Sequence, residues 1–475
     1  MKLDHMLGLD APVSYTLLAR IFNILSSVGT VLLILHFLTP VEQGYYYTLL
    51  SLVALQMVFE LGFSFVILQL AAHETAHLTL HSDGRIEGEA AARARLASVF
   101  QLTVKWYLRA AVALAVVLVP LGIVFFSRKT APGVHVAWLG PWVTAAVAVS
   151  ISFLLTPLYS FLEGCNQVRE IAQMRMYQAL VTLVLSWTAI ASGYGLYSCA
   201  LVNVGAVAVG AGVIYSKRHL LWSLLRDRGA SGAVSWQVEV WPFQWRIAIA
   251  SLSTYFTLQV FTPILFAYRG PQEAGRMGLS LSIVAYIPYL ALCWISPKAA
   301  PFGQLVNLGK LHELDSIFFR ALRQSTALVM AVSLACEGCV LVVKHVLPRI
   351  GARMESPAVF VLLLVGAISS FLVQGMGVYL RSFKREPYVV CSLVLAVTTT
   401  AVALLTASRW GSTAIALNYF LVSGVVGFVW ALLIFRSWRR LPWAACNSPA
   451  SQANRFTASL SKVVPGELAG GPNDY

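Results

Sequence analysis

Long apolar segments recur along almost the whole chain, and they restrict its fold more than any other feature. Twelve segments of about 18 residues or more lie between turns that contain Pro, Gly or Ser. Because a bilayer offers no water to unpaired backbone groups, such segments form membrane-spanning helices. Charged residues make up only 11% of the chain, against about 25% in soluble proteins. The sequence therefore predicts an all-α polytopic membrane protein with about twelve transmembrane helices. The predicted spans are 13–38, 44–70, 98–126, 136–160, 173–192, 195–216, 240–268, 276–298, 325–347, 357–380, 387–407 and 411–435.

A short pattern, P-x-E-x-G, occurs twice, nearly half the chain apart, and each copy joins one apolar segment to the next. The six residues are Pro40, Glu42 and Gly44 in the first copy, and Pro271, Glu273 and Gly275 in the second. Three fixed residues can coincide by chance, but the flanking apolar pattern repeats as well. Internal repeats are typical of transporters. We therefore expect two similar six-helix halves with a structural hairpin at each copy. The predicted divisions are 1–216 for the first half, 217–239 for a cytoplasmic linker, 240–440 for the second half and 441–475 for a disordered cytoplasmic tail.

The positions of Lys and Arg predict the orientation of the chain. With the N-terminus in the cytoplasm, 25 of the 34 basic residues fall on the inner side and 8 on the outer side. Arg20 lies inside the first span and is left out of this count. Cytoplasmic loops of membrane proteins are enriched in Lys and Arg. We therefore expect a multi-pass membrane protein with both termini in the cytoplasm. The net charge of +14 then indicates a topology signal, not binding of nucleic acid.

Motifs for catalysis are scarce. The spacing of a phosphate-binding G-x-x-x-x-G-K-[ST] loop is not met, so ATP hydrolysis is not expected. His73, Glu74 and His77 do match H-E-x-x-H, with His81 as a possible third zinc ligand. The motif falls where a span ends and a long loop, 71–97, begins, and no other protease feature accompanies it. We interpret it as incidental, and we expect no enzyme activity, no cofactor and no metal.

Two arginines lie near the inner ends of the first helices of the two halves. They are Arg20 in the first span and Arg246 at the start of the seventh. Ionisable residues within a membrane are costly and mark functional sites by default. A guanidinium can also reach out to the inner headgroups, which is the simpler explanation. The functional alternative is a cationic central cavity that binds phosphate, for which the planar fork of Arg is well suited.

Two acidic residues lie deep within predicted spans. Glu60 falls in the second span and Glu337 in the ninth. A carboxylate facing lipid is unfavourable, so each is expected to be paired with Arg, hydrogen-bonded or protonated. A structural pair is one interpretation, and coupling of transport to a proton or a cation is the other.

The N-terminal region resembles a known family. Arg20, the stretch from Leu38 to Tyr46 and then Glu60-Leu61-Gly62-Phe63 look like the start of bacterial polysaccharide-biosynthesis membrane proteins. These include O-antigen and exopolysaccharide flippases, in the superfamily that also holds MATE multidrug exporters. The resemblance implies two six-helix bundles forming a V around a central cavity, with Arg20 as the first-helix Arg and Gly44 as the hairpin Gly. The long loop 71–97 departs from the family pattern.

The family's sugar flippases move undecaprenyl-diphosphate-linked oligosaccharide to the outer leaflet for surface or extracellular polysaccharide, lipopolysaccharide included. The resemblance thus implies a flippase that works by alternating access, with the lipid-linked saccharide and membrane lipid as partners and a polymerase or other assembly protein as a possible one. The main alternative is an ion-coupled exporter of drugs or other small molecules. That class favours an acidic residue in the first span, and residues 13–38 contain none. A glycosyltransferase or polymerase is a weaker alternative, because the predicted outer loops are short and contain few acidic residues. A non-transporting scaffold that recruits synthesis enzymes through loop 71–97 or the tail is another weaker alternative.

Overall fold

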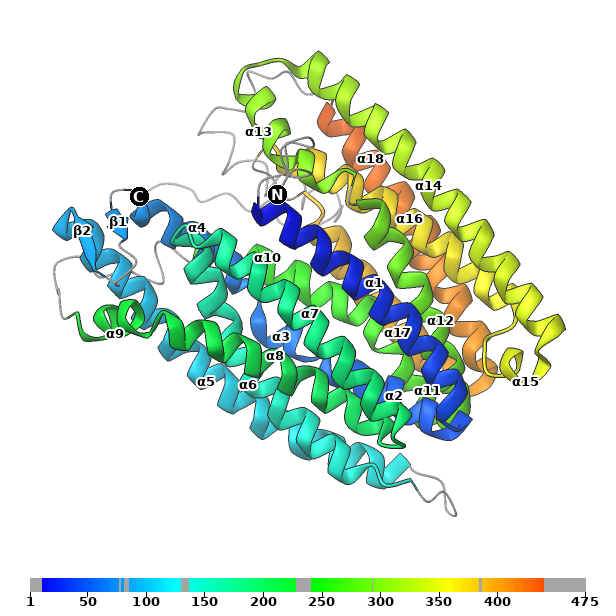
Figure 1. Ribbon diagram of the computed structural model, residues 1–475. Helices are drawn as coiled ribbons and strands as arrows, with labels where there is room; N and C mark the ends of the chain where they lie inside the picture. The colour runs from blue at the N-terminus through cyan, green and yellow to red at the C-terminus, as the bar shows by residue number, and fades with distance from the viewer. Residues whose placement is uncertain are drawn as a thin grey trace, which may run out of the picture.

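The computed structural model describes residues 11–76, 78–80, 85–129, 136–227, 241–292, 294–383 and 387–439 (Figure 1). Within these ranges, 9 helices are long and apolar enough to cross a membrane. Three further spans complete the predicted set. One is a broken helix from Pro40 to Thr75, and one is a helix, Val168–Ala191, that begins with charged residues. The third arises because the stretch Val389–Arg439 turns sharply at Gly411, whose φ is 57°. The prediction of an all-α membrane protein with about twelve spans is confirmed.

The first six spans run from residue 11 to residue 216. They are α1 (Ala11–Phe37), the broken helix α2 (Pro40–Val53), α3 (Gln56–Glu60) and α4 (Phe63–Thr75), then α5 (Ala90–Lys129), α6 (Leu139–Gly164), α7 (Val168–Ala191), and α8 (Ser198–Ser216) after the short turn η1 (Gly195–Tyr197). Two short strands, β1 (Leu78–Leu80) and β2 (Ile86–Gly88), pair antiparallel between α4 and α5. A nine-residue helix, α9 (Arg218–Arg226), follows α8.

The last six spans run from residue 241 to residue 439. They are α10 (Trp241–Thr254) with the π-helical η4 (Tyr255–Gln259) and α11 (Phe261–Arg269), then α12 (Pro271–Leu292), α14 (Leu311–Val346), α16 (Pro357–Arg381), α17 (Val389–Asn418), and the π-helical η6 (Tyr419–Val426) with α18 (Gly427–Arg439). Three short elements connect them: η5 (Ser296–Lys298), α13 (Ala299–Asn307) and α15 (Pro348–Gly351).

Helix packing follows the same scheme in both halves. In the first half α1 packs on α7, α7 on α8, α4 on α5 and α6, and α6 on α5 and α8. In the second half α10 packs on α17, α17 on η6, α12 on α14 and α16, and α16 on α14 and η6. Each of these pairings has its counterpart when spans one to six are matched to spans seven to twelve. We propose on this basis that 1–216 and 240–440 are repeated domains, as the P-x-E-x-G copies predict.

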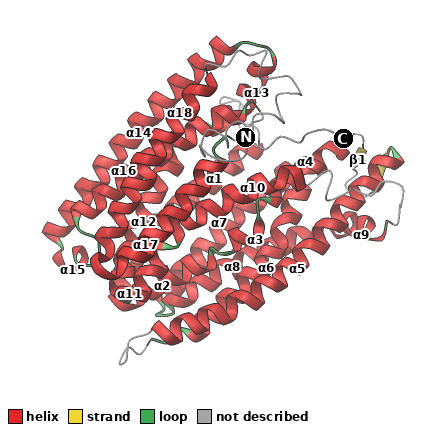
Figure 2. Cartoon of the chain, turned by 180° about the vertical axis from the view of Figure 1, so that it is seen from behind, coloured by secondary structure: helices red, strands yellow, loops and turns green. Residues whose placement is uncertain are grey.

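The two halves form a V. In Figure 1 they converge where α2, α11 and α12 lie, at the lower right, and they diverge toward α13 at the top and toward β1, β2 and α9 at the left. Figure 2 shows the same arrangement from behind. We call the converging end the repeat end, because it contains Pro40 and Pro271, and the other the opposite end. Contacts between α2 and α12 hold the halves together at the repeat end.

The second predicted span, 44–70, is not one continuous helix. Leu61 and Gly62 both adopt left-handed backbone angles, with φ of 50° and 65°. Such angles end a helix, and Gly adopts them at little cost. The sequence pattern missed the break because the apolar character of the segment continues through it. The break directly follows Glu60, which is therefore the last residue of α3 and not an interior helical residue.

The segment 71–97, expected as a long inner loop, is largely ordered. It contains the end of α4, the β1–β2 hairpin and the first turns of α5. The helix α5 begins at Ala90, eight residues before the predicted start of the third span at 98. Hydropathy gives no signal for these turns because Arg93 and Arg95 lie in them, and both form ion pairs with other parts of the chain. The expectation of a loop was wrong because a helix can continue beyond the bilayer.

Candidate functional site

The two P-x-E-x-G copies begin the two helices that join the halves. Thr39 caps α2: its backbone N–H donates to Glu42 Oε2 at 2.8 Å, and the Glu42 N–H donates to Thr39 Oγ1 at 3.2 Å. This is a capping box followed by Pro in the first turn. Glu273 has a different role at the start of α12, because its side chain accepts bonds from Arg269 Nε at 3.0 Å and from the Ser412 N–H at 2.6 Å. Glu42 and Glu273 thus occupy the same repeat position but stabilise different local structures.

Gly44 and Gly275 allow the backbones of α2 and α12 to touch. A Cβ placed on Gly44 would lie 1.9 Å from the carbonyl oxygen of Pro271. A Cβ placed on Gly275 would lie 2.9 Å from the backbone nitrogen of Gly44. Small residues permit close helix approach of this kind in membranes. The glycine of each copy therefore faces the other copy, and the two repeats form the contact between the halves at the repeat end.

Arg353 connects both halves across this contact. Its Nε donates to Gln43 Oε1 at 3.0 Å, and its two terminal nitrogens donate to the carbonyls of Leu35 at 2.6 Å and Ile34 at 3.2 Å. Gln43 is 1% exposed and also donates to the Gly275 carbonyl at 2.9 Å. Arg353 thus binds carbonyls in the last turn of α1 from the other half, and the Ile34 carbonyl also accepts from the Leu38 N–H at 3.1 Å. Burial lowers the pKa of Arg353, and Tyr47 and Glu42 oppose that shift.

A second acidic residue, Glu355, is buried beside this contact. It is 4% exposed, and its Oε2 accepts a hydrogen bond from Ser412 Oγ at 3.1 Å. Its Oε1 has no hydrogen-bond partner among the described residues. Burial raises the pKa of Glu355 above its ordinary value, although the charge of Arg276 opposes this shift.

We expect Glu355→Gln to stabilise the protein at pH 8 and to have little effect at pH 5. The pKa of Glu355 is raised in the folded protein, so its contribution to stability is fully present below the unfolded pKa and is lost as the pH rises through the folded one. An amide cannot ionise but keeps an acceptor for Ser412. Thermal unfolding in detergent at both pH values is the measurement. An equal effect at both pH values would contradict the raised pKa, and Glu313→Gln, an exposed acid on α14, is the matched control.

The halves also meet away from the repeat end, where both contributing spans are irregular. A Cβ on Gly62, at the break before α4, would lie 2.1 Å from Ile247 Cγ2 of α10. Further along the same span, the Tyr255 hydroxyl of η4 donates to the Ser51 carbonyl of α2 at 3.3 Å. Broken helices at the interface of repeats form the binding sites of many transporters, and π-helical turns are frequent at functional sites. We therefore take this contact, around Gly62 and η4, as the candidate site.

The four predicted charged residues are distributed unevenly around this site. Glu60 ends α3 at the break, half-buried, and interacts electrostatically with Tyr107 of α5, whose hydroxyl lies 3.3 Å from Ser64 Oγ. Arg246 precedes Ile247 on α10, so its backbone is close to the break, but its side chain lies outside the described part of the structure. The structure thus brings the elements of Glu60 and Arg246 together.

The other two predicted residues lie apart from the break. Arg20 is half-buried on α1, which packs along α7. Glu337 is on α14, whose main contacts are all within the second half, and its Oε2 has no hydrogen-bond partner among the described residues. Glu60 and Glu337 thus lie in different halves, and each is a separate candidate for ion coupling.

Glu74 of the H-E-x-x-H match has a structural partner. It is 5% exposed, its Oε1 accepts from Arg95 Nε at 2.9 Å, and His73 Nδ1 is 3.6 Å from the same oxygen. His77 and His81 lie outside the described residues. Within the ranges that the structure describes, no group of three or more His, Cys, Asp or Glu residues could hold a metal ion. The observed partner of Glu74 is thus an arginine that joins the ends of α4 and α5.

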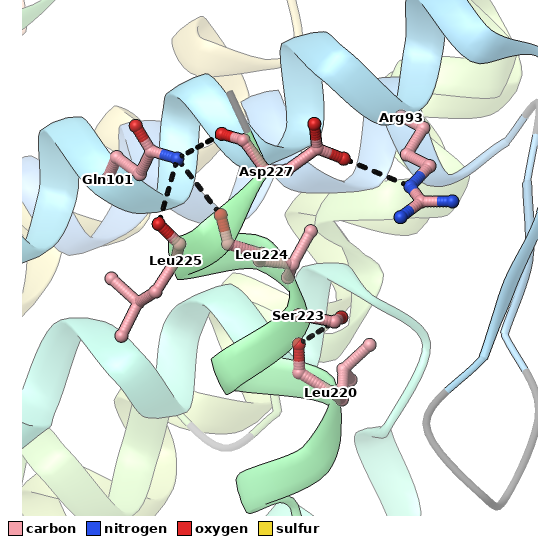
Figure 3. Close-up of polar contacts among 7 residues, drawn as sticks. All are labelled: Arg93, Gln101, Leu220, Ser223, Leu224, Leu225 and Asp227. Carbon is pink, nitrogen blue, oxygen red and sulfur yellow. Dashed lines mark hydrogen bonds and ion pairs between the residues drawn. The ribbon is translucent and has the colours of Figure 1, made fainter. Parts of the chain in front are cut away.

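A polar clamp holds the helix α9 against α5 at the opposite end (Figure 3). Gln101 Nε2 donates to the carbonyls of Asp227 at 2.8 Å and Leu224 at 3.0 Å, with Leu225 at 3.4 Å. Arg93 Nε forms an ion pair with Asp227 Oδ2 at 3.0 Å. Three leucines of α9, at 220, 221 and 224, are buried beneath it. The start of the predicted linker 217–239 is therefore a helix that is fixed to the first half.

We expect Gln101→Leu to loosen α9 more than Arg93→Gln does. The first change leaves several carbonyls at a helix end without their donor, whereas the second removes a half-exposed ion pair worth about 0–1 kcal/mol. Hydrogen exchange of the amides between 220 and 227 should become roughly tenfold faster in Gln101→Leu. Gln324→Leu, at an exposed position of α14, is the control. Unchanged exchange in Gln101→Leu would show that the leucine contacts alone hold α9.

Sequence reasoning did not identify Gln43, Arg353 or Ser412 as important. Gln43 occupies a variable position within the first repeat copy, and Arg353 was counted only as a charge of an outer loop. Gln43 and Arg353 contact each other although they are 310 residues apart in the chain. The one available signal was the position of Gln43 between two repeated residues, Glu42 and Gly44.

The comparisons with known proteins identify the fold. Over 96% of this chain and 94% of the other, the structure is similar to that of lipid II flippase MurJ in an inward closed conformation, with a TM-score of 0.57 and 11% identity. Similarity to an outward-facing MATE multidrug resistance transporter of the MOP superfamily covers 91% of this chain and 96% of the other, with a TM-score of 0.50 and 13% identity. The fold is that of the MATE-like transporters. No protein-family model and no curated protein sequence matches the chain. At these identities the likeness concerns the fold alone, and it agrees with the family resemblance of the N-terminal region.

Proposed function

We propose that the protein is a flippase that moves a lipid-linked, phosphate-bearing saccharide across the membrane by alternating access. One observation carries this proposal. The halves are joined at the repeat end by backbone contact between α2 and α12, while their opposite ends diverge (Figure 1). A transporter in one of its two end states has this form, because rocking of one repeat against the other opens each side in turn.

The orientation rests on the distribution of basic residues. In a bacterial inner membrane, with both termini on the cytoplasmic side, the repeat end faces outward and the diverging ends face inward. The structure then corresponds to a state that is closed to the outside. Release of substrate to the outer leaflet would require α2 and α12 to separate at Gly44 and Gly275.

The charge of the first span favours an anionic substrate. Arg20 is the one charged residue between Ala11 and Phe37, and Arg246 lies near the matching end of the other half. A guanidinium binds phosphate with two parallel hydrogen bonds. An undecaprenyl-diphosphate carrier presents such a group, and its saccharide would pass between the halves.

The surface of α1 fits a substrate whose tail stays in the bilayer. Leu25, Val28 and Leu32 of α1 are 52%, 58% and 62% exposed. Along most of its length α1 packs on α7, and Arg353 of the other half donates hydrogen bonds to the carbonyls of Ile34 and Leu35 near its end. Displacement of α1 from the second half would open a lateral path for a lipid tail without breaking a large interface. Glu60, at the helix break, is the better-placed candidate for ion coupling.

The experiment is complementation of cells that lack the protein. We expect Arg20→Ala and Arg246→Ala, at normal protein level, to accumulate the lipid-linked oligosaccharide on the cytoplasmic side and to lose surface polysaccharide. The matched control is Arg109→Ala, which removes an exposed arginine from α5. The mass of the accumulated lipid would also identify the saccharide.

The outcome separates the flippase from its alternatives. Normal polysaccharide in both variants and in the strain without the protein would overturn the flippase and favour export of a small molecule, which the same fold supports in the MATE transporter. Loss of polymer with no accumulated intermediate would instead point to a role in assembly, together with a polymerase or another synthesis protein.

A further inference from the structure

A groove lies on the surface of the second half, between α14 and α16. Its volume is about 620 Å³, and α14 supplies most of its lining, including Arg320, Leu322, Arg323 and Met330, while Leu372 comes from α16. The groove is separate from the contact between the halves, because the main packing partners of α14 are α12, α13, α15 and α16. It therefore lies outside the proposed substrate path.

Most of the groove lining is on an exposed face of α14, while Leu322 at its edge is partly buried against the core. The buried face of this stretch contains Leu314, Phe318, Ala321 and Ser325, spaced three and four residues apart. Arg320 and Arg323 lie between these positions, Met330 follows the next buried residue, Val329, and all three are exposed. On a helix, residues at three and four positions share one face, so the groove opens away from the core and toward the surrounding lipid.

The sequence of α14 sets the depth of the groove. Between Arg323 and Lys344 the one charged residue is Glu337, and a span of about 20 mostly apolar residues crosses the hydrocarbon core. Arg323 therefore marks one boundary of the apolar core. Arg320 and Arg323 lie at the level of the headgroups, while Met330 and Leu372 lie at the level of the acyl chains.

The two arginines are available to bind an anion. They are three residues apart on the helix, so their side chains start from neighbouring points. Across the ranges that the structure describes, neither forms an ion pair or a hydrogen bond. Two guanidinium groups beside an apolar groove match the chemistry of a phosphate attached to a hydrocarbon chain.

We propose that this groove binds an anionic phospholipid of the bilayer. The phosphate contacts Arg320 and Arg323, and an acyl chain lies along Leu322, Met330 and Leu372. A free phosphate ion would leave the apolar part unused. The lipid-linked substrate would need to pass between the halves, whereas this groove is on the outer side of one half.

The test is native mass spectrometry of the full chain, titrated with phosphatidylglycerol and, separately, with phosphatidylcholine. We expect the wild type to retain one phosphatidylglycerol, and Arg320→Gln/Arg323→Gln to bind it at least about tenfold more weakly. Lys105→Gln/Arg109→Gln is the matched control, since it removes two exposed charges from α5, the counterpart of α14 in the first half, and it should retain the lipid. Ala327→Trp keeps both arginines but fills the groove, and it should also lose the lipid.

Three results would overturn the proposal. Equal retention in the wild type and both groove variants would mean that the arginines only extend into the headgroup region. Displacement of the lipid by millimolar inorganic phosphate would identify a bare anion site. Preferential retention of a polyprenyl diphosphate over phosphatidylglycerol would assign the groove to the substrate. None of these readouts depends on transport, so the proposed function can fail while this inference stands.

Discussion

Gly44→Ala should separate the halves at the repeat end. The added methyl group would lie 1.9 Å from the carbonyl oxygen of Pro271 and 2.5 Å from its carbonyl carbon. Both are backbone atoms, so no side chain can move aside, and α2 and α12 must shift apart. Overpacking of this kind costs about 1–3 kcal/mol, which changes the ratio of two conformations by about 5- to 150-fold. We therefore expect a large shift toward the state that is open at the repeat end.

The measurement is the distance between labels on the two halves. Spin labels at Tyr194 and Trp410, which are 65% and 67% exposed, lie on separate halves near the repeat end, in a chain whose 7 native cysteines are replaced. Gly212→Ala is the control, because a Cβ at Gly212 meets nothing within 4 Å and Ala favours a helix. The same substitution should thus lengthen the distance at one glycine and leave it unchanged at the other. An unchanged distance in Gly44→Ala would refute a closed contact there.

Arg353→Met should weaken the same contact by a different route. Methionine keeps most of the apolar stem but loses the hydrogen bonds to Gln43 and to the carbonyls of Leu35 and Ile34. A hydrogen bond to a charged group contributes about 1.5–3 kcal/mol, and the buried amide of Gln43 would lose a partner as well. We expect a loss of about 3 kcal/mol in the stability of the closed state, seen as a lower unfolding temperature and a longer distance between the two labels.

Two further variants separate hydrogen bonding from charge. Arg349→Met removes an exposed arginine from α15 at the same end of the molecule, and it should have little effect. Arg353→Lys keeps the charge, but an ammonium group cannot reach Gln43 and both carbonyls in the guanidinium's geometry, so only partial rescue is expected. If Arg349→Met were as harmful as Arg353→Met, net charge at this end would be the cause and the specific bonds would not matter.

The sequence was sufficient for the layout of the fold because lipid imposes a simple rule. Apolar segments must be helices of a minimum length, and this rule predicted about twelve spans, including the two that meet at Gly411. This rule did not predict the helix break at Leu61 and Gly62, since an apolar segment has the same hydropathy whether its backbone is continuous or broken. It did not predict the first turns of α5 either, because these turns extend beyond the apolar stretch. Arg93 and Arg95, which lie in them, form ion pairs with acidic residues elsewhere in the chain.

The candidate site was less accessible from sequence. The repeat identified Gly44 and Gly275, but spacing alone could not reveal that the two copies contact each other. Arg353 reaches α1 and α2 across more than 300 residues of chain, and nothing local distinguishes it from Arg349. Conversely, Glu337 was prominent as a charge within a span, yet it lies on the outer helix α14. Contacts between distant residues decide such roles, and one sequence contains no direct record of them.

Transport by the purified protein is the most direct test of the proposed flippase. The full chain would be reconstituted in liposomes that contain a fluorescent undecaprenyl-diphosphate oligosaccharide, and the fraction of saccharide accessible to an added glycosidase would be followed over time. We predict rapid movement between leaflets with the wild-type protein, slow movement with Arg20→Ala, and normal movement with Arg109→Ala. Equal rates in protein-containing and empty liposomes, in the presence of proton and sodium gradients, would contradict the account.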